Sequence, residues 1–119
     1  MLKLVRYINE RGGHAFIPLL EDPKNEYSSV NEVFESFLNH EIEVSSQIDE
    51  LVGLALSERD YSTHNFLQWY VAEQIEEESL ARTILDKLAL IGEDKGGFYM
   101  FDRDLVNIKS SLSNENTGI

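Results

Sequence analysis

Two long helical patterns in direct succession, over residues 29–59 and 61–91, constrain the fold of this 119-residue chain more than any other feature. The first opens with a capping box at residues 29–32 and runs without a proline to Asp60, which offers the cap for the second. Gly92 stands where the second pattern ends, as a glycine often does after a helix. Two such helices joined by so short a turn lie antiparallel, so the fold class is predicted to be all-α.

Each pattern carries an apolar stripe that acidic residues interrupt. The first stripe breaks at Glu41. The second breaks at Glu73, Glu76 and Glu77. The apolar members recur every three or four residues, as expected of a helix face that packs on a core. They are Val30, Phe34, Phe37, Val44, Ile48, Leu51 and Ala55 in the first stripe, and Phe66, Trp69 or Tyr70, Leu80, Ile84, Leu88 and Ile91 in the second.

The two breaks meet at one level of the predicted hairpin. Glu41 lies 19 residues before Asp60 and Glu77 lies 17 residues after it. At about 1.5 Å per residue, the two carboxylates stand roughly 28 and 26 Å from the turn. Buried carboxylates without a cationic partner are costly, and neither stripe offers a lysine or arginine at that level. A bound metal ion would neutralise them, so the pattern predicts a metal site.

The three consecutive glutamates at positions 76–78 cannot share one exposed face. Successive residues are rotated by about 100°, so the three span about 200° of the helix and at least one turns inward. Glu77 is the best placed to do so. Glu78 is assigned to solvent, paired with Arg82 one turn later. Gln74 lies on the flank of the stripe, and the pattern alone favours a surface position for it.

The segments outside the hairpin are shorter and less regular. Residues 1–12 read as the end of a helix, and residues 13–28 as a crossover loop with two prolines. Some sixteen extended residues at roughly 3.3 Å each reach about 50 Å, enough to run beside a long helix and let the helices on either side lie parallel. A short helix is expected over 102–109, followed by a loose tail over 110–119.

The net charge of −12 disfavours nucleic acid and anionic membranes as partners and favours cations. The chain has no cysteine, which excludes disulfides and thiolate sites and leaves oxygen-rich, hard-metal chemistry open. His14, His40 and His64 share no ligand spacing and are read as structural or exposed. Since no apolar run could cross a bilayer and no signal peptide is visible, a cytoplasmic location is expected.

Four stretches make the sequence similar to the non-haem bacterial ferritins. They are NERGGHAF from Asn9, FLNHEIEVSSQIDEL from Phe37, NFLQWYVAEQIEEE from Asn65 and GGFYMFDRDL from Gly96. The resemblance implies a ferritin-like four-helix bundle with a long crossover loop and a short fifth helix. It also implies a homo-oligomeric shell of 24 subunits that oxidises Fe²⁺ and stores it as a ferric mineral.

By position, the resemblance places Glu41 and Gln74 in a di-iron ferroxidase centre. Glu77 is similar to the residue that contacts the second iron, and together with Glu73 and Glu76 it resembles a third iron site. Only the resemblance turns Gln74 from a surface residue into a ligand. In such a centre, two carboxylate-bridged iron ions each give one electron to O₂ or peroxide.

Half of the ligand set implied by the resemblance lies outside this sequence. In the family, the first helix supplies a glutamate and the second a Glu-x-x-His, and both fall before residue 1. The chain is therefore expected to be N-terminally truncated, lacking helix 1 and the first half of helix 2. A misplaced start, a fragment or a truncated subunit would each explain this.

The expected consequences of that truncation are weak metal binding and little ferroxidase activity. The apolar stripes would be exposed, which predicts an oligomeric, swapped or poorly folded chain. The alternative to an iron-storage subunit is a non-catalytic acidic helical module that assembles and nucleates mineral.

Overall fold

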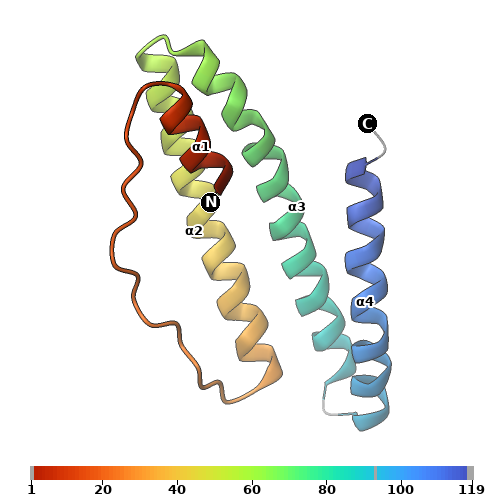
Figure 1. Ribbon diagram of the computed structural model, residues 1–119. Coiled ribbons are helices and arrows are strands. Elements are labelled where there is room, and N and C mark those ends of the chain that lie inside the picture. The colour runs from red at the N-terminus through yellow and green to blue at the C-terminus, as the bar shows by residue number, and fades with distance from the viewer. Residues whose placement is uncertain (1, 93, 118–119) are drawn as a thin grey trace.

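The computed structural model describes residues 2–92 and 94–117, and within these ranges all regular structure is helical (Figure 1). The helices are α1 (Leu2–Glu10), α2 (Val30–Ser57), α3 (Tyr61–Ile91) and α4 (Lys95–Thr117). α2 and α3 form an antiparallel hairpin, with α1 over its turn end and α4 along the C-terminal part of α3. The all-α class is thus confirmed. None of the helices in the described ranges is long and apolar enough to cross a membrane.

Side-chain caps begin both helices of the hairpin. At the start of α2, Ser29 Oγ accepts a hydrogen bond from the Glu32 N–H at 3.1 Å. At the start of α3, Asp60 accepts one bond from the Thr63 hydroxyl and another from the Thr63 N–H at 3.1 Å. These two bonds hold the pKa of Asp60 below its ordinary value. The caps satisfy backbone donors that a helix start leaves free.

A tight backbone turn ends α2 and leads directly into α3. The Asp60 N–H donates to the Ala55 carbonyl at 2.8 Å, and the Arg59 N–H donates to the Leu56 carbonyl at 3.1 Å. This pair of bonds is the Schellman motif, which requires a left-handed residue just past the helix. Here that residue is Arg59, with φ of 55°, where a glycine is usual.

Replacing Arg59 with glycine is expected to stabilise the chain. A side chain in the left-handed region costs about 1–2 kcal/mol, part of which is offset by the greater freedom of glycine when unfolded, so a gain of about 1 kcal/mol is expected. Chemical denaturation measures it. The matched control is Glu58→Gly, because Glu58 has an ordinary right-handed conformation, and this change should destabilise. Equal effects of the two substitutions would contradict strain at Arg59.

The crossover segment at residues 11–29 is extended and runs down the side of α2 (Figure 1). α1 and α2 consequently point in the same direction, and both run opposite to α3. The segment is exposed, including Phe16 at 81% and Leu19 at 101% of their full accessible surface. Its length therefore serves to connect two parallel helices rather than to build core.

α1 is attached to α3 through aromatic and cationic side chains. Tyr7 stacks on Phe66 with ring centroids 4.0 Å apart, and its hydroxyl lies 2.9 Å from Thr63 Oγ1. Lys3 Nζ lies 4.0 Å from the centroid of Trp69, a cation–π contact. α1 itself has no fully buried residue. These contacts help to hold the helix on α3.

The end of the crossover is clipped to the first turn of α2 by Glu32. Its carboxylate accepts bonds from Lys24 Nζ, from the Ser28 hydroxyl and, at 2.7 Å, from the Ser28 N–H. The Lys24 bond, followed by the two Ser28 bonds, lowers the pKa of Glu32 to about 2. The clip therefore requires the ionised carboxylate.

The clip predicts a specific pH dependence. The pKa of Glu32 is depressed on folding, so its contribution is complete above the ordinary value of 4.5 and is lost as pH falls toward about 2. Thermal melts should show Glu32→Gln less stable than the parent chain by a constant amount above pH 5. The gap should close between about pH 4.5 and 2. Glu26→Gln, an exposed change on the same segment, is the control, and a gap that persists at pH 2 would reject the clip.

α4 completes an apolar cluster at the end of the hairpin that lies away from the turn. Ile84 and Leu88 of α3 are buried against Phe101 of α4, and Phe34 of α2 meets Phe101 edge to face at 6.1 Å between ring centroids. The partly buried members around this cluster are Phe34, Leu80, Ile91, Phe98 and Leu105. Three helices thus share one core at this end.

The prediction of a short helix over 102–109 with a loose tail from 110 is corrected, because α4 extends from Lys95 to Thr117. Gly96 and Gly97, which precede the predicted helix, lie in the first turn of α4. The Gly96 N–H donates to the Asp94 carboxylate at 3.1 Å, which begins the helix. A side chain at Gly97 would come within 2.8 Å of Ile91, so glycine permits close packing on α3. Positions 118 and 119 of the expected tail lie outside the described residues.

Candidate metal centre

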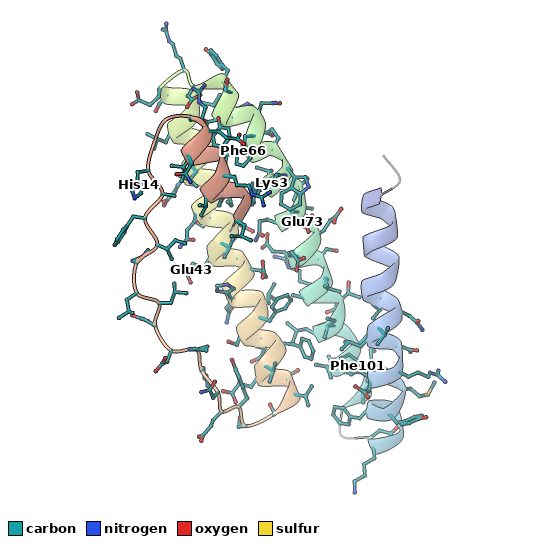
Figure 2. All side chains as sticks on the ribbon, in the orientation of Figure 1. Lys3, His14, Glu43, Phe66, Glu73 and Phe101 are labelled. Atoms are coloured by element: carbon teal, nitrogen blue, oxygen red, sulfur yellow. The ribbon has the colours of Figure 1, made fainter. Side chains whose placement is uncertain are left out.

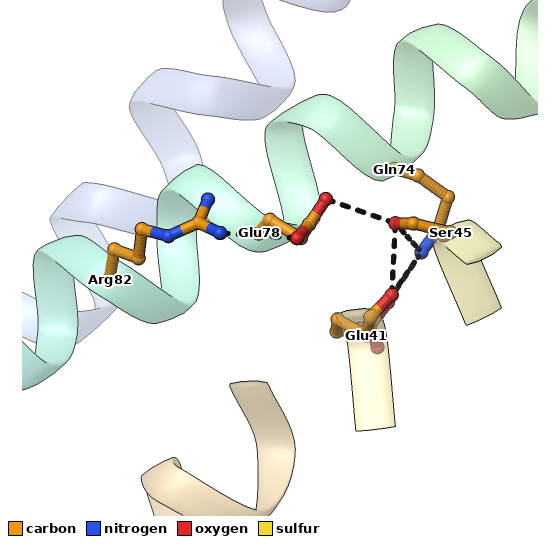
Figure 3. A network of polar contacts seen from close by, with 5 residues as sticks. All are labelled: Glu41, Ser45, Gln74, Glu78 and Arg82. Atoms are coloured by element: carbon orange, nitrogen blue, oxygen red, sulfur yellow. Dashed lines mark hydrogen bonds and ion pairs between the residues drawn. The ribbon is translucent and has the colours of Figure 1, made fainter. Parts of the chain in front are cut away.

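A glutamate of α2 and a glutamine of α3 meet across the hairpin. Gln74 Nε2 donates to the Glu41 carboxylate at 3.0 Å and to the Glu41 backbone carbonyl at 3.1 Å (Figure 3). Both residues are half-buried. Glu41 of α2 therefore meets the acidic stretch of α3 at the predicted level, and Gln74 is a residue of that stretch that bonds it.

Three further residues extend this contact into a network. Ser45, one turn after Glu41, lies with its hydroxyl 3.2 Å from Gln74 Nε2 and 3.0 Å from Glu78 Oε2. Arg82 Nη2 donates to the other oxygen of Glu78 at 3.2 Å. We call these five residues, Glu41, Ser45, Gln74, Glu78 and Arg82, the interhelical network (Figure 3).

The assignment of Glu78 to solvent was wrong. Its side chain keeps only 19% of its accessible surface, and it reaches α2 through Ser45 while also pairing with Arg82 as expected. The spacing could have revealed this, since Glu78 follows Gln74 by four residues and so lies on the same helix face. Ser45 was missed although it stands in the same relation to Glu41.

Glu73, Glu76 and Glu77 are half-buried on α3, and Figure 2 places Glu73 midway along that helix. The neighbouring Ile75 is far more exposed, at 65%. The acidic residues of this stretch are thus less exposed than Ile75, the apolar residue among them. This is the reverse of an ordinary amphipathic helix, in which charge faces solvent.

In the described part of the chain, no group of three or more histidine or acidic side chains converges closely enough to hold a metal ion. The network brings together two carboxylates and one carboxamide, from Glu41, Glu78 and Gln74. His14 lies on the exposed crossover and His40 is exposed on α2, whereas His64 contacts Gln68. The reading of the three histidines as structural or exposed rather than as ligands stays a prediction.

The donor set of Glu41 and Gln74 suits a hard cation. Carboxylate and carboxamide oxygens are the ligands that Fe²⁺ and similar ions accept in oxygen-rich sites. Gln74 turns its nitrogen to α2, so its carbonyl oxygen lies on the other side of the carboxamide. Glu41 and Gln74 could therefore supply some of the ligands of a metal site, but the described residues do not supply a complete ligand set.

Residues 1–91 match the family described as Ferritin-like domain. The chain is also 50% identical over 110 residues to a probable bacterial non-heme ferritin-like protein of Haemophilus influenzae, covering 92% of this chain and 67% of that protein. The chain belongs to the ferritin family. A bacterial non-heme ferritin of Campylobacter jejuni is 44% identical over 109 residues, which cover 92% of this chain and 65% of that ferritin.

Solved ferritin structures resemble the fold as well. An open pore ferritin from the hyperthermophilic archaeon Archaeoglobus fulgidus superposes with a TM-score of 0.85 at 45% identity, covering 87% of this chain and 64% of that one. A Chlorobium tepidum ferritin gives a TM-score of 0.75 at 45% identity. The chain therefore spans about two thirds of the length of the ferritins that it matches.

The bonds of Gln74 predict a measurable contribution to the stability of this ferritin chain. Gln74→Leu removes the donor to Glu41 and leaves a half-buried carboxylate without that bond, so a loss of about 1–3 kcal/mol is expected. Urea denaturation measures it. The matched control, Gln68→Leu, alters an exposed glutamine on the same helix and should change stability by less than about 0.5 kcal/mol. Similar losses in both variants would show that the network adds nothing.

Proposed function

We propose that this chain is a subunit of an iron-storage ferritin that oxidises Fe²⁺ and retains the ferric product. The observation that carries the proposal is the hydrogen bond between Glu41 and Gln74 across the hairpin. Both residues occupy positions that the ferritin resemblance assigns to the ferroxidase centre. Family membership supports iron as the ion, and the net charge of −12 favours its accumulation near the protein.

Within this proposal, Glu41 and Gln74 contribute oxygen ligands to a di-iron centre. Glu77 contacts the second iron, and Glu73, Glu76 and Glu77 form a third iron site. Iron is the substrate: two Fe²⁺ ions each release one electron. O₂ accepts the pair with two protons from water to give hydrogen peroxide, or hydrogen peroxide accepts it with two protons to give two water molecules. The half-burial of the three α3 glutamates supports their turning toward bound cations rather than toward water.

The residues of this chain alone supply only part of that centre. Because the described residues bring no three histidine or acidic ligands together, we expect Fe²⁺ binding by this chain to be weak and oxidation slow. Carboxylates held at a helix interface still bind a hard cation better than dispersed surface carboxylates, since they need not be ordered first. The cytoplasmic location expected from the sequence remains a prediction.

We also propose that the chain forms a homo-oligomer, with the 24-subunit shell of the ferritin resemblance as its expected form. Apolar residues of both hairpin helices are exposed, among them Leu54 at 57% and Trp69 at 50%. Leu51, a member of the predicted stripe of α2, is 43% exposed. Apolar surface of this kind is usually covered by another chain.

Anaerobic Fe²⁺ titration tests the assignment of Glu41. Glu41→Ala should weaken binding by at least about tenfold, the loss typical even of an outer-shell partner. The control is Glu43→Ala, an exposed glutamate of the same helix that takes no part in the network (Figure 2), and it should bind as the parent chain does. Unchanged affinity in Glu41→Ala would remove Glu41 from the site.

The second candidate is a non-catalytic acidic module that assembles and only nucleates mineral. It is favoured by one observation, that fewer than three histidine or acidic ligands converge among the described residues. Admitting O₂ after Fe²⁺ loading separates the two. Equal rates of mineral formation in the parent chain, Glu41→Ala and Glu43→Ala would favour the module, whereas slower oxidation in Glu41→Ala alone would favour the ferroxidase.

A further inference from the structure

Ser45 lies at the centre of the interhelical network, where neither the spacing nor the ferritin resemblance gave it a role. Its hydroxyl oxygen is 3.2 Å from Gln74 Nε2, 3.0 Å from Glu78 Oε2 and 2.9 Å from the Glu41 backbone carbonyl. A serine hydroxyl has one proton and can donate only once. If another acceptor takes this proton, Ser45 can only accept a hydrogen bond from Gln74.

Glu78 is the stronger acceptor, because a hydrogen bond to a carboxylate is assisted by its charge. Arg82 holds Glu78 Oε1 at 3.2 Å, which leaves Oε2 directed at α2 and Ser45 (Figure 3). With its proton donated to Glu78, Ser45 offers a lone pair to Gln74. Glu78 thus makes Ser45 an acceptor.

The orientation of the Gln74 carboxamide follows from these acceptors. Its Nε2 lies within hydrogen-bond distance of three of them, Ser45 Oγ and the carboxylate and backbone carbonyl of Glu41, and its two N–H protons are shared among the three. Turning the carboxamide by about 180° would set its oxygen against the same three oxygens, with only the Ser45 proton available between them. It would also point N–H groups toward a bound cation. The orientation decides whether Gln74 can be an oxygen ligand.

We propose that Ser45 and Glu78 are positioning residues that hold the Gln74 carboxamide with its oxygen available to the metal ion. The proposal rests on the iron site proposed above. Once a metal ion draws on the Glu41 carboxylate, the acceptors that remain for Gln74 Nε2 are the Glu41 backbone carbonyl and Ser45 Oγ. Ser45 is not a ligand in this scheme, so it keeps Nε2 in place while the Glu41 carboxylate shifts. Such outer-shell bonds orient ligands in metal sites generally.

Titration of the full chain with Co²⁺, followed by visible absorption, tests the role in metal binding. Ser45→Ala and Glu78→Leu should each weaken Co²⁺ binding by about tenfold or more. Ser45→Thr keeps the hydroxyl and should restore affinity to within about threefold of the parent, inside the range of a retained outer-shell bond. Glu43→Leu is the control for loss of an exposed carboxylate on α2. If Ser45→Ala and Glu78→Leu bind as Glu43→Leu does, the proposal is overturned.

A metal-free measurement separates this proposal from the iron assignment. The effects of Glu78→Leu and Gln74→Leu on the unfolding equilibrium constant should be non-additive by about threefold or more. They should become additive when Ser45 is already alanine, since Ser45 carries the coupling. Coupling that is absent, or that persists without Ser45, overturns the positioning role. If the coupling depends on Ser45 but the chain binds no Co²⁺, the result supports the role of Ser45 and Glu78 in orienting Gln74. The same result rejects the proposed metal site.

Discussion

The register of α2 against α3 is set by the turn at Arg59 and Asp60, and the interhelical network depends on it. Glu41 lies 19 residues before Asp60 and Glu78 lies 18 after it, whereas Ser45 lies 15 before and Gln74 lies 14 after. One residue added to the turn would rotate α3 by about 100° and move it by about 1.5 Å. Gln74 would then leave Glu41. The left-handed conformation at Arg59 is therefore tolerated in a turn that cannot be lengthened without loss of the network.

Much of the hairpin could be predicted from the sequence, because cap residues mark where its helices begin and apolar residues recur at helical spacing. The caps at Ser29 and Asp60 and the rise per residue sufficed to bring the break at Glu41 level with the acidic stretch of α3. The fold class followed from the same features. The constant rise per residue predicts the position of a residue along the helix axis well, but the direction of its side chain is predicted less well.

What the sequence did not yield depended on partners that are distant along the chain. Gln74 needed the ferritin resemblance, because a lone carboxamide has no strong preference for interior or surface. Glu78 was misassigned since Arg82 already gave it a partner, yet a carboxylate has two oxygens and the second bonds Ser45. α4 was underestimated because the use of Gly97 becomes clear only when Ile91 is seen against it.

The attachment of α1 has a consequence for how that helix forms. None of its described residues is fully buried, so little apolar burial stabilises this helix. Lys3 gains its contact with the electron-rich face of Trp69 only when α1 is docked. Helix formation in α1 is thus coupled to its docking on α3. The helicity of this segment therefore reports whether the aromatic side chains of α3 that it contacts, Phe66 and Trp69, are in place.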